Sequence, residues 1–220
     1  MQKERRFTAD AAHELHTPVA GIKAQAQVAR AASNDAKRTH ALDNAILGCD
    51  RAAHLIEQLL TLARIDTLGD EATRSCQLGA IAAEVIAAIA PTALGLGVRL
   101  ELTTSDEAVV RGDPLLLRIL LRNLIDNAVR HTAPGTSVMV SVAVQQGQTS
   151  LSVSDDGPGI SEADLSRITE RFYRPVGTSA SGSGLGLSIV KRIAEIHSAT
   201  LQIAPQKAGN GLCVTVIFKS

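Results

Sequence analysis

Two runs of turn-forming residues in the C-terminal half most constrain the fold of this chain. Residues 154–160 (SDDGPGI) follow residues 149–153 (TSLSV), whose alternation of polar and apolar positions predicts a half-buried strand. Residues 182–188 (GSGLGLS) lead into Val190, Ile193 and Ala194, whose spacing predicts an amphipathic helix. Glycines let backbone N–H groups approach an anion, and a helix start adds its positive dipole end. The two loops therefore predict either a paired anion site or two ordinary turns.

The composition indicates a globular chain of one or two domains. Its 220 residues are 45% hydrophobic and 20% charged, so a sizeable core is possible. With 3 Phe, 1 Tyr and no Trp, that core must be aliphatic. The net charge is zero and the basic residues are scattered, which argues against nucleic acid as a partner because phosphate binding needs a dense basic face.

Cysteines and apolar runs give two further expectations. Cys49, Cys76 and Cys213 are far apart and match no metal-binding spacing, so we expect buried thiols in a reducing compartment. Residues 78–98 are mostly apolar, with Glu84 as their only charge, and Pro91 interrupts them. We expect a buried helix of a soluble chain over about 79–90, ending before Pro91, and not a membrane span.

Residues 1–66 show helical periodicity and predict an antiparallel hairpin. Ser33 to Asp35 supply a turn and an N-cap between two helices. Two helices alone bury little surface, so we expect a homodimeric four-helix bundle; a monomeric hairpin packed on the rest of the chain is the alternative. Apolar positions at spacings of three and four predict the seams: Ala11, Leu15, Val19, Ile22, Ala26 and Ala29 in the first helix, and Leu42, Ile46, Cys49, Ala53, Ile56, Leu60 and Ala63 in the second.

His13 lies about half a turn away from the predicted seam of the first helix, so we expect it to be exposed. Glu14 flanks it, and Thr17 lies on the same face one turn later. Pro18 removes a helical hydrogen bond from the carbonyl of Glu14 and predicts a distortion beside the histidine. An exposed histidine alone is usually a surface residue; this combination is more specific.

After a predicted linker at residues 67–75, residues 76–220 mix helix and strand signals. Asp113 and Pro114 predict the N-cap and first position of a helix. This pattern predicts an α/β sandwich, one sheet with helices on one face. The expected strands are 98–102, 136–144, 148–154, 199–204 and 212–218, and the remaining helix starts at 184.

Three polar residues share one face of the helix after Pro114. Asn123 and Asn127 present two amides, whose oxygens suit Mg²⁺, and Arg130 lies one turn further on, where it could meet a phosphate. The alternative is a solvated face. Asp155 ends a strand before glycines, where its carboxylate could accept from an amino group or simply cap the turn.

These segments resemble the five sequence boxes of bacterial sensor histidine kinases, in the family order and spacing. The resemblance covers nearly the whole chain and is nearest to sensors of the quorum-sensing or polymyxin-resistance type. The matching segments are FTADAAHELHTP (7–18) for the H box, NLIDNAVRHT (123–132) for the N box, DDGPG (155–159) for the G1 box, ERFYRP (170–175) for the F box and GSGLGL (182–187) for the G2 box.

The resemblance implies a dimerisation and phosphotransfer hairpin followed by an ATP-binding domain of the gyrase–chaperone–kinase type. It implies that His13 accepts the phosphoryl group, that Glu14 is its base and that Thr17 orients water for dephosphorylation of a regulator. Asn127, with Asn123, matches the Mg²⁺ position. The positions that it assigns to ATP are Arg130, His131, Asp155, Gly157, Gly159, Arg174, Gly182, Gly184, Leu185 and Gly186. For the F box two alternatives stay open: either Arg174 or Arg171 contacts phosphate, or both arginines only anchor the lid over the nucleotide.

The resemblance also implies partners and a location. They are a second copy of the chain, the receiver domain of a response regulator docking near residues 22–30, and the cytoplasmic side of the bacterial inner membrane, reached through a sensor region outside this sequence. His16 departs from the family's usual Arg or Lys, and His197-Ser198-Ala199 from its usual His-Gly-Gly. The rival classes are an ATP-driven machine, which would want a glutamate where Asn123 stands, and a degenerate module that only binds a partner.

Overall fold

The structure is a computed structural model that describes residues 2–65, 74–105, 107–175, 182–206 and 211–219, with side chains from Ala9 onward. The chain separates into two compact units, residues 1–66 and 67–220. Most of the predicted linker lies outside the described residues, and its last two residues, Arg74 and Ser75, belong to a strand. Each unit has its own architecture and is described by itself.

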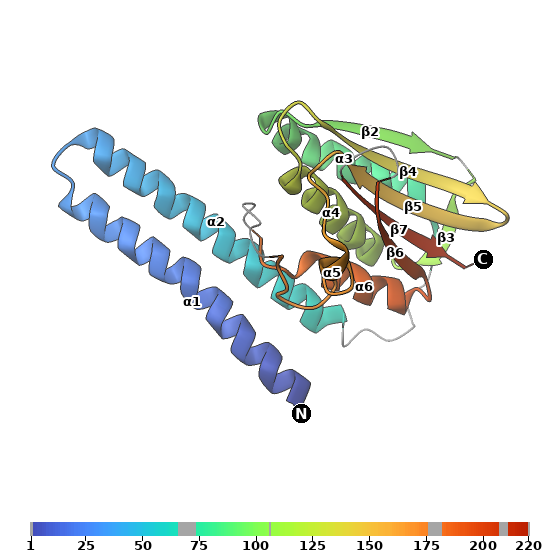
Figure 1. Ribbon diagram of the computed structural model, residues 1–220, viewed down its shortest axis with the longest axis horizontal. Coiled ribbons are helices and arrows are strands. Elements are labelled where there is room, and N and C mark those ends of the chain that lie inside the picture. Colours follow the sequence, from blue (N-terminus) through green and yellow to red (C-terminus); the bar gives the residue numbers. More distant parts are fainter. Residues whose placement is uncertain (1, 66–73, 106, 176–181, 207–210, 220) are drawn as a thin grey trace. The chain divides into compact units, whose positions relative to one another are not determined.

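The N-terminal unit is an antiparallel pair of long helices, α1 (Gln2–Ala31) and α2 (Asp35–Ile65), as the sequence predicted (Figure 1). Asn34 caps α2, because its side-chain oxygen accepts from the backbone N–H of Lys37 at 2.8 Å. Pro18 lies inside α1 without ending it. The predicted turn and cap between the helices are confirmed.

The seam predicted for the second helix is wrong for a single hairpin. The α2 residues buried in the hairpin are Ala41, Gly48, Leu55, Gln58, Leu62 and Ile65. Small side chains at Ala41 and Gly48 allow the helices to approach, so the larger apolar residues one position further on remain outside. The predicted seam is exposed along its whole length: Leu42, Ile46, Cys49, Ala53, Ile56, Leu60 and Ala63. In α1 the prediction holds for Ala29, which is buried, and for the half-buried Ala11, Leu15 and Ile22, whereas Val19 and Ala26 are exposed.

The C-terminal unit is built on a five-stranded sheet with the order β2-β4-β5-β7-β6. β2 and β4 are parallel and the other neighbours are antiparallel. The strands are β2 (Arg99–Thr104), β4 (Ser137–Gln145), β5 (Gln148–Asp155), β6 (Thr200–Pro205) and β7 (Leu212–Phe218). A separate two-stranded sheet pairs β1 (Arg74–Gln77) with β3 (Val109–Gly112), which the sequence did not indicate because four-residue strands show too little alternation.

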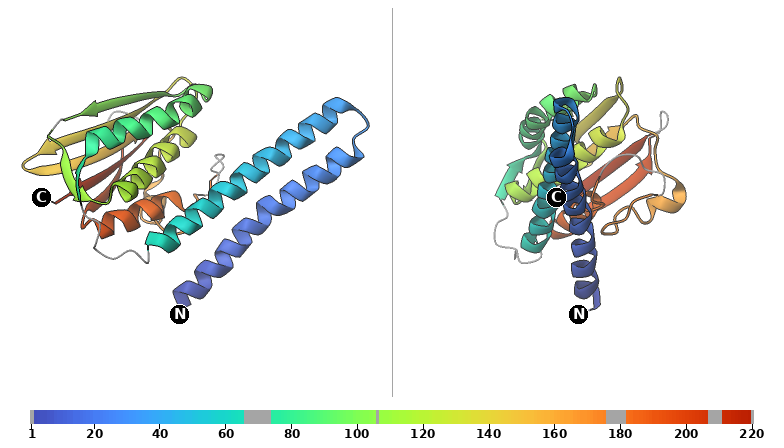
Figure 2. Two further views of the ribbon diagram at one scale, coloured as in Figure 1. Left: turned by 180° about the vertical axis from the view of Figure 1, so that it is seen from behind. Right: turned by 90° about the vertical axis from the view of Figure 1, so that its left-hand side faces the viewer.

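Three helices cover one face of the large sheet: α3 (Leu78–Gly95), α4 (Pro114–His131) and α6 (Gly186–Ile196) (Figures 1 and 2). A short helix, α5 (Glu162–Leu165), follows β5. The inward strand positions Val138, Val140, Leu151 and Val216 are fully buried, whereas Ser150, Ser152 and Ser154 on the opposite face of β5 are half-buried. The α/β sandwich predicted from the sequence is confirmed, and its core is aliphatic.

The prediction that α3 ends before Pro91 is wrong, because the helix continues to Gly95. Ile89 and Ala93, on either side of the proline, are both buried and hold the helix against the core. Ala87, whose carbonyl loses its helical donor, is exposed, so water can replace the missing N–H. By length and composition α3 could cross a membrane. Six of its residues are buried, however, which is the pattern of a core helix, as predicted.

The three cysteines are free, but only Cys76 is buried; Cys213 is partly buried and Cys49 is exposed. The prediction of a buried thiol at Cys49 is therefore wrong, because this residue belongs to the outward stripe of α2. Within the described ranges, no group of three His, Cys, Asp or Glu side chains could hold a metal ion.

Candidate functional site

His13 is exposed on α1, as its position relative to the seam predicted, and Glu14 beside it is half-buried. The hydroxyl of Thr17 donates to the backbone carbonyl of His13 at 3.3 Å. Pro18 leaves the carbonyl of Glu14 without its helical donor. This turn of the helix therefore holds an accessible imidazole, a carboxylate and a hydroxyl close together in sequence and space.

The helix α4 carries the two asparagines at the edge of its buried face, where both are half-buried. It begins where the sequence predicted, since the carboxylate of Asp113 accepts from the N–H groups of Leu115 and Leu116. The Asn123 amide nitrogen donates to the Ile119 carbonyl at 2.8 Å, which fixes how its oxygen points. Asn127 is half-buried, and its side chain has no hydrogen-bond partner among the described residues. An unpaired amide at this depth is available to a ligand.

The structure brings the second glycine loop beside this helix. A Cβ on Gly186 would lie 3.4 Å from the Asn123 side-chain oxygen. Gly186 is the first residue of α6, whose free N–H groups face the same region and favour an anion. Leu185 is fully buried, whereas Gly182 is exposed.

Basic groups gather at the C-terminal end of α4. Arg130 forms an ion pair with Asp126 through Nε and Oδ2 at 2.8 Å. Burial lowers the pKa of His131, and the positive charges of Arg174 and Arg130 lower it further. The neutral imidazole of His131 is therefore favoured, and the charge of Arg174, in the F box, acts on this residue of the N box. Arg171 is exposed.

Asp155 is buried at the end of β5. Burial raises the pKa of its carboxyl, and the backbone N–H groups of Gly157 and Leu212 offset part of this effect. The Gly157 N–H donates to Asp155 Oδ1 at 2.9 Å. A buried carboxylate with so little solvation is costly unless a further donor, such as a ligand amino group, reaches it.

Oxygen atoms pack closely around the buried Gly157. A Cβ at this position would lie 2.7 Å from Asp155 Oδ1, 2.8 Å from the His131 carbonyl and 3.3 Å from the Thr132 hydroxyl. The Thr132 hydroxyl is buried and has no hydrogen-bond partner among the described residues. Sequence reasoning missed Thr132, although a hydroxyl directly after the predicted helix was the available signal. Acceptor oxygens with an orphaned hydroxyl fit a polar heterocycle that carries an amino group.

The F box and the second glycine loop are joined at their ends. The Phe172 N–H donates to the Gly184 carbonyl at 3.0 Å. Gly184 has φ +69° and lies so close that a Cβ would be 2.7 Å from the carbonyl carbon of Phe172. Phe172 itself has φ +63°, which is strained for a bulky residue. Residues 176–181 of this segment lie outside the described ranges.

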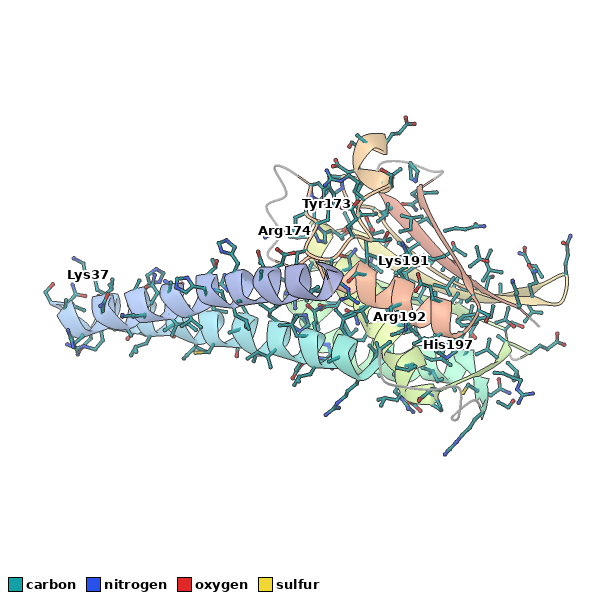
Figure 3. The ribbon with its side chains drawn as sticks, turned by 90° about the horizontal axis from the view of Figure 1, so that it is seen from below. Lys37, Tyr173, Arg174, Lys191, Arg192 and His197 are labelled. Carbon is teal, nitrogen blue, oxygen red and sulfur yellow. The ribbon has the colours of Figure 1, made fainter. Side chains whose placement is uncertain are left out.

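Tyr173 fixes the same segment from the other side. Its hydroxyl donates to Asp164 Oδ1 at 2.5 Å, and the guanidinium of Arg167 lies 4.1 Å from the centre of its ring. Figure 3 labels Tyr173 and Arg174 on this segment, and Lys191, Arg192 and His197 along α6. Gly159, with φ +74°, has the backbone of Gly211 against it, since a Cβ there would lie 3.3 Å from the Gly211 nitrogen.

Comparison with protein families assigns both units. Residues 3–68 match the His Kinase A (phospho-acceptor) domain, and residues 112–220 match the histidine kinase-, DNA gyrase B- and HSP90-like ATPase domain. The chain belongs to the sensor histidine kinases. The C-terminal unit is accordingly a member of an ATP-binding family, and the resemblance seen in the sequence is confirmed.

Curated sensor kinases match over almost the whole chain. The sensor protein QseC of Salmonella typhi is 43% identical over 214 residues, which cover 95% of this chain and 46% of the relative. The sensor protein kinase PmrB of Pseudomonas aeruginosa is 36% identical over 222 residues, or 99% of this chain and 46% of the relative. The chain thus spans about half the length of these two sensor kinases.

Solved structures of histidine kinases have the same fold. The Acinetobacter baumannii histidine kinase AdeS superposes with a TM-score of 0.71 at 24% identity, covering 94% of this chain and 97% of AdeS. The cytoplasmic segment of histidine kinase QseC gives a TM-score of 0.55 at 29% identity, covering 78% of this chain and 94% of that segment.

Proposed function

We propose that this chain is the catalytic region of a sensor histidine kinase that transfers the γ-phosphoryl group of ATP to His13. The observation that carries the proposal is the exposed His13 in a phospho-acceptor domain, in one chain with a buried Asp155 and a paired set of glycine loops in an ATPase domain. One chain therefore holds both the histidine that accepts the phosphoryl group and the domain that binds its donor, ATP.

The nucleotide is held by contacts of two kinds. The Asp155 carboxylate accepts from the amino group of adenine, near the Thr132 hydroxyl, which is buried and lacks a partner among the described residues. The backbone N–H groups at the start of α6 donate hydrogen bonds to phosphate oxygens. Of the two F-box arginines, Arg174 is the preferred phosphate contact, because its charge already acts on His131. Asn127 is the residue that would hold Mg²⁺, with Asn123 beside it, and the ion would offset charge on the phosphates.

His13 acts as the nucleophile of the transfer. One imidazole nitrogen forms a bond to the γ-phosphorus as the bond between that phosphorus and the bridging oxygen of ADP breaks, and the proton of the other nitrogen passes to Glu14. The exposure of His13 allows the in-line approach that this displacement requires. His16, also exposed on this helix, supplies a second imidazole three residues from His13.

The kinase works as a homodimer and passes the phosphoryl group on. The exposed apolar stripe of α2 supplies the dimer surface. A receiver domain docks near residues 22–30 and takes the phosphoryl group on an aspartate, and Thr17 orients the water that later removes it. The parent protein is anchored in the bacterial inner membrane with this region on the cytoplasmic side.

Two measurements on one reaction separate this function from its rivals. Purified chain is incubated with ATP, and acid-labile phosphoprotein and free phosphate are followed together. We expect phosphoprotein to accumulate to a plateau with little free phosphate until a receiver domain is added. Steady phosphate release without phosphoprotein would indicate an ATP-driven machine, and the absence of both would indicate a binding module.

The Thr17→Ala variant tests the separate role of that hydroxyl. We expect normal labelling from ATP and slower dephosphorylation of the phosphorylated receiver domain. Loss of both activities would contradict separate roles.

A further inference from the structure

His197, at the end of α6, joins two helices of the C-terminal unit. Its Nδ1 lies 2.8 Å from the Ile193 carbonyl on its own helix. Its Nε2 accepts from the backbone N–H of Asp113, the N-cap of α4, at 3.2 Å. Both contacts are satisfied only when Nδ1 carries the proton and Nε2 does not. The ring therefore bridges the end of α6 and the start of α4 in one defined tautomer.

Neighbouring residues on two sides restrict the position of the His197 ring. A Cβ on Gly112 would lie 2.5 Å from His197 Cδ2 and 2.6 Å from Nε2, so only glycine fits beside it. On another side, Phe218 meets the ring edge-on with centroids 6.3 Å apart. Three separate elements thus fix one half-buried side chain that none of the proposed chemistry uses.

The geometry of α4 and α6 connects this bridge to the nucleotide site. The two helices pack side by side in opposite directions, with Asp113 against His197 at one end and Asn123 against Gly186 at the other. The two segments between these contacts span about 15 Å on α4 and about 16.5 Å on α6 at the rise of an α-helix. Because helices are stiff over this length, fixing one end fixes the other.

We propose that His197 is a positioning residue that sets the axial register of α6 against α4, and with it the placement of the α6 N-terminus beside Asn123. This inference rests on the proposed function, in which that N-terminus holds the phosphates. Asp155 lies on β5 and reads adenine independently of α6. Loss of the bridge should therefore weaken binding of the phosphates and leave binding of the base unchanged.

The test compares His197→Asn with His197→Gln in the full chain. The asparagine side-chain amide can donate to the Ile193 carbonyl in place of Nδ1, but it does not reach the Asp113 N–H. The glutamine side-chain oxygen reaches about as far as Nε2 of histidine and can accept from the Asp113 N–H. Titration calorimetry measures the dissociation constants of a non-hydrolysable ATP analogue and of AMP. We expect the asparagine variant to lose about ten-fold in affinity for the analogue and the glutamine variant less than about three-fold, with AMP within about two-fold for both.

Gly112→Ala should displace the His197 ring, because the added Cβ would collide with it. Glu195→Gln, a substitution at an exposed residue on the same turn of α6, is the control. We expect Gly112→Ala to reproduce the asparagine phenotype and the control to match the wild type. Equal losses for the analogue and AMP, or no rescue by glutamine, would overturn the inference. Failure of the wild type to bind the analogue at all would instead contradict the proposed function.

Discussion

At Asp155, stability and ligand binding make opposite demands on one side chain. Burial raises the pKa of the carboxyl, so the folded state holds its proton more tightly than the unfolded chain does. The stability gained by this protonation is present in acid and lost as the pH rises through the folded pKa, which leaves a cost at neutral pH. Such a cost is typical of a group kept for a ligand.

Asp155→Asn should therefore separate the two properties. We expect the melting temperature without nucleotide to stay unchanged or rise, and ATP affinity to fall by about ten- to a hundred-fold. Thermal unfolding with and without ATP measures both. Asp156→Asn is the matched control, since the carboxylate of this exposed neighbour accepts from the Ser137 hydroxyl. Lower stability together with unchanged ATP binding would contradict the assignment.

His131 predicts a dependence of stability on acid. Its pKa is lowered in the folded state by burial and by two arginine charges, so the unfolded chain binds the proton more readily. The stability is complete above the unfolded value near 6.5 and declines as the pH falls below it, by at most about 1.4 kcal/mol per pH unit. Denaturant unfolding at pH 7.5 and 5.5 should show a smaller decline for His131→Gln than for the wild type. An equal decline in both proteins would contradict this account.

The sequence predicted the environment of some individual residues and missed that of others. The exposure of His13 and the cap at Asp113 follow from local spacing and chemistry, and both were predicted correctly. The orphaned hydroxyl of Thr132, the strained φ of Phe172 and the bridge at His197 depend on atoms from distant segments. Such contacts are created by tertiary packing, so periodicity alone gives no sign of them.

At the scale of elements, two glycines of the hairpin make a matched pair. Gly48 is buried where α2 approaches α1, and a Cβ there would lie 2.7 Å from Ile22 Cγ1. Gly21 on α1 has open space around it in the single hairpin. Gly21→Ala should stabilise the hairpin by about 1 kcal/mol through helix propensity. Gly48→Ala should destabilise it, because overpacking costs about 1–3 kcal/mol.

Thermal unfolding followed by circular dichroism, at one protein concentration for all variants, distinguishes the two glycines. If Gly48→Ala stabilised the hairpin as much as Gly21→Ala, the close approach of the helices at this position would be wrong.

The elements that the sequence misplaced show where local rules fail. Pro91 predicted a helix end, but burial of Ile89 and Ala93 on the packed side outweighs the lost hydrogen bond. The seam of α2 was assigned one position too far along the helix, to residues such as Leu42 and Ile56, whereas the hairpin buries Ala41, Gly48, Leu55 and Leu62. In both cases packing against a neighbouring element decides which residues are buried, and the sequence of a single helix does not show the shape of that neighbour.

At the scale of the whole molecule, the exposed stripe of α2 predicts dimerisation. Ile46 is 59% exposed and Leu60 is 54% exposed in the single chain, which leaves apolar surface without cover. Ile46→Glu should shift the chain from dimer to monomer, as sedimentation equilibrium would measure. Leu94→Glu, the same change at an 80% exposed leucine of the C-terminal unit, is the control and should leave the dimer intact. A monomeric wild type would contradict the prediction.

The central claim is that His13 receives the terminal phosphoryl group of the nucleotide bound by the same kinase. The most direct measurement is incorporation of label from γ-³²P-ATP into wild type, His13→Gln and His40→Gln, the last being an exposed histidine on α2. We predict an acid-labile, alkali-stable label in the wild type and His40→Gln, and none in His13→Gln. Labelling of His13→Gln at the wild-type rate would contradict the account.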